Sequence, residues 1–405
     1  MDPRLNKVFS ADELLKITRD LISIDSSTSC PARERDVVKY LQDLFTREGI
    51  EHYFQDVDKG RGNVIAVLKG TKGEKGIMLN GHMDTVPYFG MDDPLKPTEK
   101  DGKLYGRGTS DMKSGLAAMA YTLIMFKRAG IPLRGDLVFA GVIDEEAGKS
   151  SGSKYIAKNG PFTEYAIVGE PTGLVPVIAH KGIDYFTVIF TGKAAHSSIP
   201  KNGANAIYAA ADYISLFRNE QIPRYDTKKH PILGPPAVNL TLTRGGAQAN
   251  RDFLFEKAET YAGVVPDYCQ IWMDIRWVPP MTIKGILEDL GEIALKAAQT
   301  NPGVTIDAEY IELPRPAMEI DPNDKLVQSL LIHAKEILGR KVEPQGVSYF
   351  ADSGILYGMG HILSLVLGPG DIGVAHSVNE HIQISQIEGA ARIYAQTALD
   401  LLEDK

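Results

Sequence analysis

Side chains of the types that can bind metal ions follow four separate apolar runs in this chain. The side chains are, in chain order, His82 with Asp84, Asp144 with Glu145 and Glu146, Glu170, and His376. Imidazole and carboxylate groups without thiolates suit Zn²⁺, and Co²⁺ or Mn²⁺ are substitutes at such sites. A metal-dependent active site is therefore the leading hypothesis for the function of this chain.

The apolar runs themselves indicate where these side chains lie. Residues 76–80, 137–143, 165–169 and 364–367 are short and almost continuously apolar, as expected of strands that are buried on both faces. Such strands form largely parallel sheets with helices on both sides, and ligands bind at the carboxyl ends of the strands. We therefore expect an α/β domain with a mostly parallel mixed sheet and the site at that edge.

Each of these residues also has a simpler interpretation. His82 and Asp84 fit an ordinary polar loop, and Asp111 lies at the start of a predicted helix, where Asp commonly caps backbone N–H groups. The stretch 106–115 around Asp111 is rich in glycine but is neither a dinucleotide fingerprint nor a P-loop. The acidic run 144–146 fits a solvated loop, although adjacent acids at a buried strand end repel one another unless a cation or a proton compensates.

The order of the predicted elements indicates one domain inserted into another. A chain of 405 residues exceeds what a single hydrophobic core usually organises. Strands and helices alternate as far as Gly173, and the next segment then reads as strand, helix, strand, strand and helix. We assign residues 1–182 and 314–405 to a discontinuous catalytic domain and residues 183–313 to an inserted ferredoxin-like α+β domain.

Composition excludes several classes of function. The net charge of -8 argues against a nucleic-acid surface, which would need a basic stripe. The N-terminal segment 1–7 lacks the apolar core of a secretory signal, and the longest apolar stretch, 116–126, is too short to span a bilayer. Only Cys30 and Cys269 are present, which suits a reducing cytosol. We expect a cytoplasmic protein that binds neither nucleic acid nor membrane.

Two residues of the inserted segment complete the set of candidates. His196 comes shortly after the predicted strand 183–191, and Arg276 ends the predicted strand 270–276. A surface histidine and a surface ion pair are the simpler interpretations. A planar guanidinium nevertheless binds a carboxylate through two hydrogen bonds, which favours Arg276 for recognising the carboxyl group of an amino acid.

Taken together, these motifs resemble the dinuclear zinc hydrolases, and the match extends in the same order along nearly the whole chain. That family includes acetylornithine deacetylase, succinyl-diaminopimelate desuccinylase, aminoacylase and glutamate carboxypeptidase. The resemblance implies two Zn²⁺ ions that Asp111 bridges, and a cis peptide bond between Asp111 and Met112. One ion would be held by His82, Asp111 and Glu170, and the other by Asp111, Glu146 and His376.

The same resemblance implies roles in catalysis. Glu145 would be the general base that takes a proton from a metal-bridged water, the nucleophile, and delivers it to the leaving nitrogen. Asp84 would orient His82. In the inserted lid and dimerisation domain, His196 would stabilise the oxyanion, often from the partner subunit, and Arg276 would bind a substrate carboxylate. A homodimer formed through the inserted domain is therefore expected.

The resemblance implies hydrolysis of the amide bond of an N-acyl amino acid, because Glu170 stands where the aminopeptidase and dipeptidase branch more often has Asp. A metallocarboxypeptidase or dipeptidase acting on short peptides or acyl-glutamates is the alternative. A non-catalytic amide-binding protein is a more distant alternative, since Glu145 and all the proposed ligands are present. A two-metal phosphohydrolase is a further alternative, but it would need more basic residues around the site. The chain departs from the usual family pattern at residues 262–263 and 349–350, and these departures affect the expected shape of the pocket for the acyl group.

Overall fold

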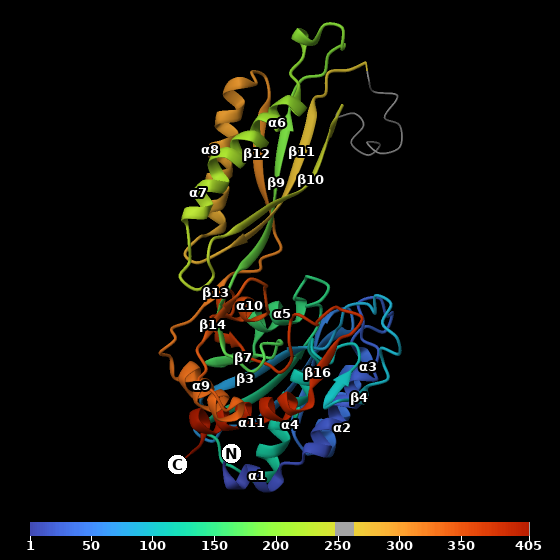
Figure 1. Cartoon of the computed structure of the whole chain (residues 1–405), viewed down its shortest axis with the longest axis vertical. Coiled ribbons are helices and arrows are strands. Elements are labelled where there is room, and N and C mark those ends of the chain that lie inside the picture. The colour runs from blue at the N-terminus through green and yellow to red at the C-terminus, as the bar shows by residue number, and fades with distance from the viewer. Residues whose placement is uncertain (248–262, 405) are drawn as a thin grey trace. The chain divides into compact units, whose positions relative to one another are not determined.

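The computed structural model describes residues 1–247 and 263–404, which form two compact units (Figure 1). Unit 1 comprises Met1–His180, Met318–Val347 and Ala351–Lys405, and unit 2 comprises Lys181–Ala317 and Ser348–Phe350. Unit 2 is thus inserted into the sequence of unit 1. Among the described residues, no helix combines the length and the apolar character needed to cross a lipid bilayer.

Unit 1 contains most of the helices and strands. Its helices are α1 (Pro3–Val8), α2 (Ala11–Ile22), α3 (Arg35–Arg47), α4 (Lys113–Ala129), α5 (Ser151–Asn159), α9 (Lys325–Leu338), α10 (Ser353–Gly358) and α11 (Ile384–Leu402). Its strands are β1 (Glu51–Asp58), β2 (Arg61–Leu68), β3 (Glu74–His82), β4 (Thr98–Lys100), β5 (Lys103–Tyr105), β6 (Gly135–Val142), β7 (Tyr165–Val168), β8 (Val177–His180), β13 (Met318–Glu319), β14 (Gln345–Val347), β15 (Leu363–Val366) and β16 (His381–Gln383). Nine of these strands form the main sheet, in the order β1-β2-β6-β3-β7-β15-β8-β13 with β14 beside β8.

The centre of the main sheet is parallel, and helices cover both of its faces. Strands β6, β3, β7 and β15 run in the same direction, so their carboxyl ends meet at one edge. Side chains of β2 alternate between two cores: Val64 packs in the core that contains α4 and α11, and Ile65 packs in the core of α5 and α10. Figure 1 shows these two pairs of helices on opposite sides of β3 and β7. The predicted α/β fold class is confirmed.

Helix α4 lies inside the larger core. All of its side chains from Lys113 to Phe126 are buried, so it lacks the polar face of a surface helix. It ends at Gly130, whose φ of 62° is a left-handed conformation that glycine adopts without strain. Because Asp111 is only two residues before the start of this buried helix, the position of Asp111 depends on the core of unit 1.

Unit 2 has a hydrophobic core of its own. Its elements are β9 (Gly182–Thr191), η1 (Pro200–Asn202), α6 (Ala206–Leu216), η2 (Phe217–Gln221), α7 (Ile222–Thr227), β10 (Ala237–Gly246), β11 (Tyr268–Trp277), α8 (Ile283–Thr300) and β12 (Thr305–Ile311). The strands form an antiparallel sheet in the order β10-β11-β9-β12. Phe190 of β9, Tyr213 of α6 and Leu290 of α8 share one buried cluster, which joins both helices to this sheet.

Candidate metal centre

The side chains that the sequence marks as metal ligands reach the carboxyl-end edge of the main sheet. His82 is the last residue of β3, and Glu146 and Glu170 follow the ends of β6 and β7. His376 lies in the irregular segment after β15, and Asp111 precedes α4. Because β3, β6, β7 and β15 are parallel neighbours, the segments that leave them are brought together in space.

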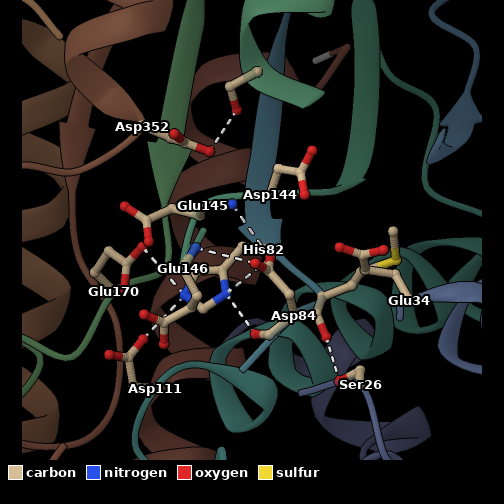
Figure 2. A network of polar contacts seen from close by, with 12 residues as sticks. Ser26, Glu34, His82, Asp84, Asp111, Asp144, Glu145, Glu146, Glu170 and Asp352 are labelled. Atoms are coloured by element: carbon tan, nitrogen blue, oxygen red, sulfur yellow. Dashed lines mark hydrogen bonds and ion pairs between the residues drawn. The ribbon is translucent and has the colours of Figure 1, made fainter. Parts of the chain in front are cut away.

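Asp111 lies between the two histidines. Its Oδ1 atom is 3.0 Å from Nε2 of His82, and its Oδ2 atom is 3.1 Å from Nε2 of His376. Oε1 of Glu170 is 3.6 Å from Nε2 of His82, and Oε1 of Glu146 is 3.1 Å from Nε2 of His376. Figure 2 shows His82, Asp111, Glu146 and Glu170 pointing toward one another. The side chains thus form two sets that share Asp111, and the Asp111–Met112 peptide bond is cis, as expected.

The electrostatics of the carboxylates fit bound cations. Burial, with Asp111 adding to it and His82 opposing it, raises the pKa of Glu170 to about 8. Burial and then the Glu170 carboxylate raise the pKa of Glu145 well above its usual range. Oε1 of Glu170 is buried and makes no hydrogen bond. Crowded, buried carboxylates keep their protons unless a positive charge is nearby, so this set of donors suits divalent metal ions.

Neighbouring carboxylates raise the pKa of both imidazoles, His82 and His376. Hydrogen bonds to Asp111 and then Glu146 raise the pKa of His376 to about 10. Burial disfavours the charged form of His82, but Glu170 and Asp111 outweigh burial and raise its pKa well above the usual value. An imidazole binds a metal ion only in its neutral form, so metal binding here releases protons and depends on pH.

Asp84 contacts His82 through its main chain rather than its side chain. Nδ1 of His82 is 2.8 Å from the backbone carbonyl oxygen of Asp84, whereas the nearest carboxylate oxygen is 3.7 Å away. The carboxylate instead accepts hydrogen bonds from the backbone N–H groups of Glu145, at 3.3 Å, and Glu146, at 3.0 Å. Asp84 therefore connects the end of β3 to the segment that follows β6.

Arg61 compensates the negative charge of Asp144, the first acidic residue of the run 144–146. Its Nη2 atom donates to Oδ1 of Asp144 at 2.6 Å and to Oε1 of Glu34 at 2.8 Å. Burial opposes ionisation of Asp144, but Arg61 lowers its pKa. Sequence reasoning recognised that these adjacent acids need a compensating charge, but it did not identify Arg61, which is distant in the sequence.

Glu145 lies among other carboxylates. Figure 2 shows it near Glu170, with Asp352 of the loop before α10 close by. Asp352 accepts a hydrogen bond from the hydroxyl of Ser153 at 2.7 Å, and its other carboxylate oxygen, Oδ1, is buried without a hydrogen-bond partner. Oε1 of Glu146 is 3.1 Å from Nε2 of His376, whereas Glu145 lies near Glu170, so the two adjacent glutamates are placed for different roles.

His196 and Arg276 lie in unit 2. Nδ1 of the exposed His196 is 2.7 Å from the hydroxyl oxygen of Ser198. Arg276 donates two hydrogen bonds to the carboxylate of Asp274, at 2.9 and 3.1 Å. Burial, and then the charge of Arg276, lowers the pKa of Lys181, so a second cationic side chain lies near Arg276. Sequence reasoning did not single out Lys181.

Comparison with known sequences identifies the family. Residues 78–400 match the model of the peptidase family M20/M25/M40. The acetylornithine deacetylase of Proteus mirabilis (strain HI4320) is 30% identical over 395 residues, which cover 94% of this chain and 95% of that protein. The fold and the cluster of donors therefore define a metal-dependent hydrolase. The chain belongs to the peptidase family M20/M25/M40, which confirms the resemblance seen in its motifs.

Solved structures share the fold over nearly the whole chain. The aminopeptidase PepT from Bacillus cereus ATCC 10987 has a TM-score of 0.76 at 24% identity, covering 97% of this chain and 99% of that chain. The YXEP protein of Bacillus subtilis, described as a dinuclear metal binding peptidase from the M20 family, has a TM-score of 0.70 at 16% identity. That match covers 96% of this chain and 98% of the Bacillus subtilis chain.

Proposed function

We propose that this metal-dependent hydrolase cleaves the amide bond of an N-acyl amino acid and holds two Zn²⁺ ions to do so. The observation that carries the proposal is the position of Asp111 between His82 and His376, 3.0 and 3.1 Å from their Nε2 atoms. The relative named acetylornithine deacetylase supports deacylation. Glu170 supports it as well, because Asp is more frequent at this position in aminopeptidases and dipeptidases of the family.

The donor atoms divide into two metal positions. His82, Asp111 and Glu170 would hold one ion, and Asp111, Glu146 and His376 would hold the other. The similar structure described as a dinuclear metal binding peptidase supports two ions rather than one. Imidazole and carboxylate donors without thiolates favour Zn²⁺, and the same donors accept Co²⁺ or Mn²⁺.

Glu145 is the general base in this proposal. Divalent cations held by the ligands named above would supply polarisation of the scissile carbonyl group and a pKa of about 7 for the attacking water. Glu145 accepts the proton of that water and delivers it to the leaving nitrogen, a transfer that typically supplies roughly 10²–10⁴ in rate. Asp84 holds the backbone of Glu145 and Glu146 in place through its carboxylate.

Unit 2 supplies the recognition of the substrate in this proposal. Arg276 binds the carboxylate of the amino acid, since a guanidinium offers two parallel N–H donors to a carboxylate. His196 donates a hydrogen bond to the oxyanion that develops on the scissile carbonyl, an effect commonly worth about 10²–10³ in rate. Tyr349 and Phe350 belong to unit 2 and limit the size of the acyl group. Ala262, the other departure from the family pattern, lies outside the described residues.

The proposal includes a homodimer formed through unit 2 in the cytoplasm. Strand β12 is at the edge of its sheet and borders an apolar groove against α8, where Leu295 is 72% exposed. An edge strand with an exposed apolar neighbour is suited to pairing with the same elements of a second copy. Cys30 and Cys269 are both free thiols, which fits a reducing compartment.

A substrate panel tests the proposed function. One zinc-loaded preparation is assayed for amine release from N-acetyl amino acids including acetylornithine, from N-succinyl diamines and from dipeptides. We expect N-acyl amino acids to give the highest kcat/KM, and the same preparation stripped with a chelator to be inactive until zinc is restored. A preference for dipeptides would replace the proposal with the peptidase alternative, and tight amide binding without turnover would replace it with the non-catalytic one.

A further inference from the structure

We infer that Glu380, paired with Arg107, is a positioning residue for Asp111 and for the loop that carries His376. By fixing the distance between these two ligands, Glu380 determines the affinity of the metal position that they share. The inference rests on the metal centre proposed above. Neither residue is among the proposed metal ligands.

Glu380 and Arg107 form an ion pair that is removed from water. Glu380 is 0% exposed and Arg107 is 1% exposed. Nη1 of Arg107 donates to Oε2 of Glu380 at 2.5 Å, and Nη2 donates to the backbone carbonyl oxygen of Tyr88 at 3.1 Å. Burying two charges costs free energy that only close contact and additional hydrogen bonds offset. The pair is therefore held in one geometry by its surroundings.

The other oxygen of Glu380 binds the backbone that presents Asp111. Oε1 accepts hydrogen bonds from the N–H groups of Ser110, at 2.9 Å, and of Asp111, at 3.1 Å. Hydrogen bonds to an ionised acceptor are about twice as strong as neutral ones. Glu380 thus fixes the peptide units directly before the carboxylate that lies between the two histidines.

The same contacts locate the segment that carries His376. The hydroxyl of Ser110 donates to the carbonyl oxygen of Asp371 and accepts from its N–H, both at 3.0 Å. His376 lies between Asp371 and Glu380, so its segment is tied on both sides to the residues next to Asp111. Its side chain is 48% exposed, so packing alone does not hold it. Its distance from Asp111 therefore depends on these two ties.

Loss of the Glu380 contacts is expected to affect the two metal positions unequally. Asp111 contributes to both positions, but His376 contributes only to the one that also contains Glu146. When Asp111 and His376 lose their common support, the position that needs both of them weakens more. Residues that orient metal ligands typically contribute roughly 10- to 100-fold in metal affinity.

Two double variants separate positioning from the stability that a buried pair confers. Arg107→Met with Glu380→Gln removes both charges but keeps a carbonyl oxygen for the two N–H groups. Arg107→Met with Glu380→Leu removes the charges and the acceptor at similar side-chain size. Zinc is titrated calorimetrically into each metal-free protein, and hydrogen exchange is measured over residues 106–111 in the same metal-free samples.

We expect the Leu variant to bind the second zinc equivalent roughly 10- to 100-fold more weakly than the Gln variant, and the amides of Ser110 and Asp111 to exchange faster. Equal affinities for the second equivalent in the two variants would overturn the inference. If the Leu variant fails to fold, Glu380→Asn with Arg107→Met replaces it, because this neutral side chain is one methylene shorter than Gln and withdraws the acceptor. Equality with the Gln variant again overturns the inference.

A control and the wild-type titration separate the remaining outcomes. Tyr121→Phe removes a buried hydroxyl that accepts the N–H of Ser10 at 2.7 Å and should lower stability without changing either zinc affinity. If the control weakens the second equivalent as much as the Leu variant does, general destabilisation explains the loss and the inference fails. Wild-type protein that binds fewer than two equivalents would instead contradict the proposed function.

Discussion

The carboxylate of Asp84 accepts a hydrogen bond from the backbone N–H of Glu146 at 3.0 Å. Its second oxygen accepts the N–H of Glu145, and its backbone carbonyl oxygen is 2.8 Å from Nδ1 of His82. Burial, with His82 opposing it, raises the pKa of Asp84 to about 7. One buried residue therefore contacts a proposed ligand on β3 and the segment that carries both the proposed base and another ligand.

Asp84→Asn should lower kcat by roughly 10- to 100-fold, the range for residues that orient metal ligands. An amide has one acceptor oxygen and an NH₂ group, so either Glu145 or Glu146 would face a donor instead of an acceptor. The contact of His82 with the backbone carbonyl oxygen should persist. Steady-state kinetics and metal analysis of the purified variant measure both effects, and a wild-type kcat would show that the carboxylate is not needed.

Glu145→Ala should keep near-stoichiometric zinc and lose at least about 10²-fold in turnover, because it removes the proposed general base but no ligand. Metal content by atomic absorption and turnover of the best substrate are measured on one preparation. Glu145→Gln provides a control of matched size and should be similarly inactive. Normal turnover in either variant would assign the base to another group.

Thermal unfolding of the metal-free protein should depend on Glu170. Its pKa is raised from 4.5 to about 8 in the folded state, mainly by burial. A carboxyl group with a raised pKa stabilises the folded state fully at pH below the unfolded pKa, and this contribution is lost as the pH rises through the folded pKa. We expect Tm in EDTA to fall between about pH 5 and pH 8, and Glu170→Gln to flatten the decline. An equal slope in wild type and variant would contradict this.

His196→Ala should lose about 10²-fold in turnover with unchanged metal content, because it removes a proposed oxyanion donor and not a ligand. Mixing this variant with Glu145→Ala and allowing subunits to exchange should restore part of the activity if His196 acts on the partner subunit. Each variant exchanged with itself is the control. Failure to recover activity, with exchange verified by mass labelling, would place His196 and Glu145 in the same subunit.

The fold was predictable where a continuous apolar run was sufficient to identify a buried strand. Segments 76–80 and 137–143 are apolar throughout because strands in the middle of a parallel sheet are buried on both faces, and they form β3 and β6. Strand β12, Thr305–Ile311, was not predicted, because it lies at a sheet edge and alternates exposed and half-buried residues. Helix α5, Ser151–Asn159, was not predicted either, since only part of one face is buried.

The donor types and their order along the chain could be read from the amino-acid sequence, because each donor follows a recognisable strand or precedes a helix. Which atoms contact one another became clear only from the folded chain. Asp111 lies between His82 and His376, Arg61 pairs with Asp144, and Glu380 binds the backbone N–H of Asp111. Those contacts join residues far apart in the chain, and local patterns of polarity carry no information about such pairing. A buried charge is stable only beside a compensating group, and the packing of the whole core determines which residue supplies that group.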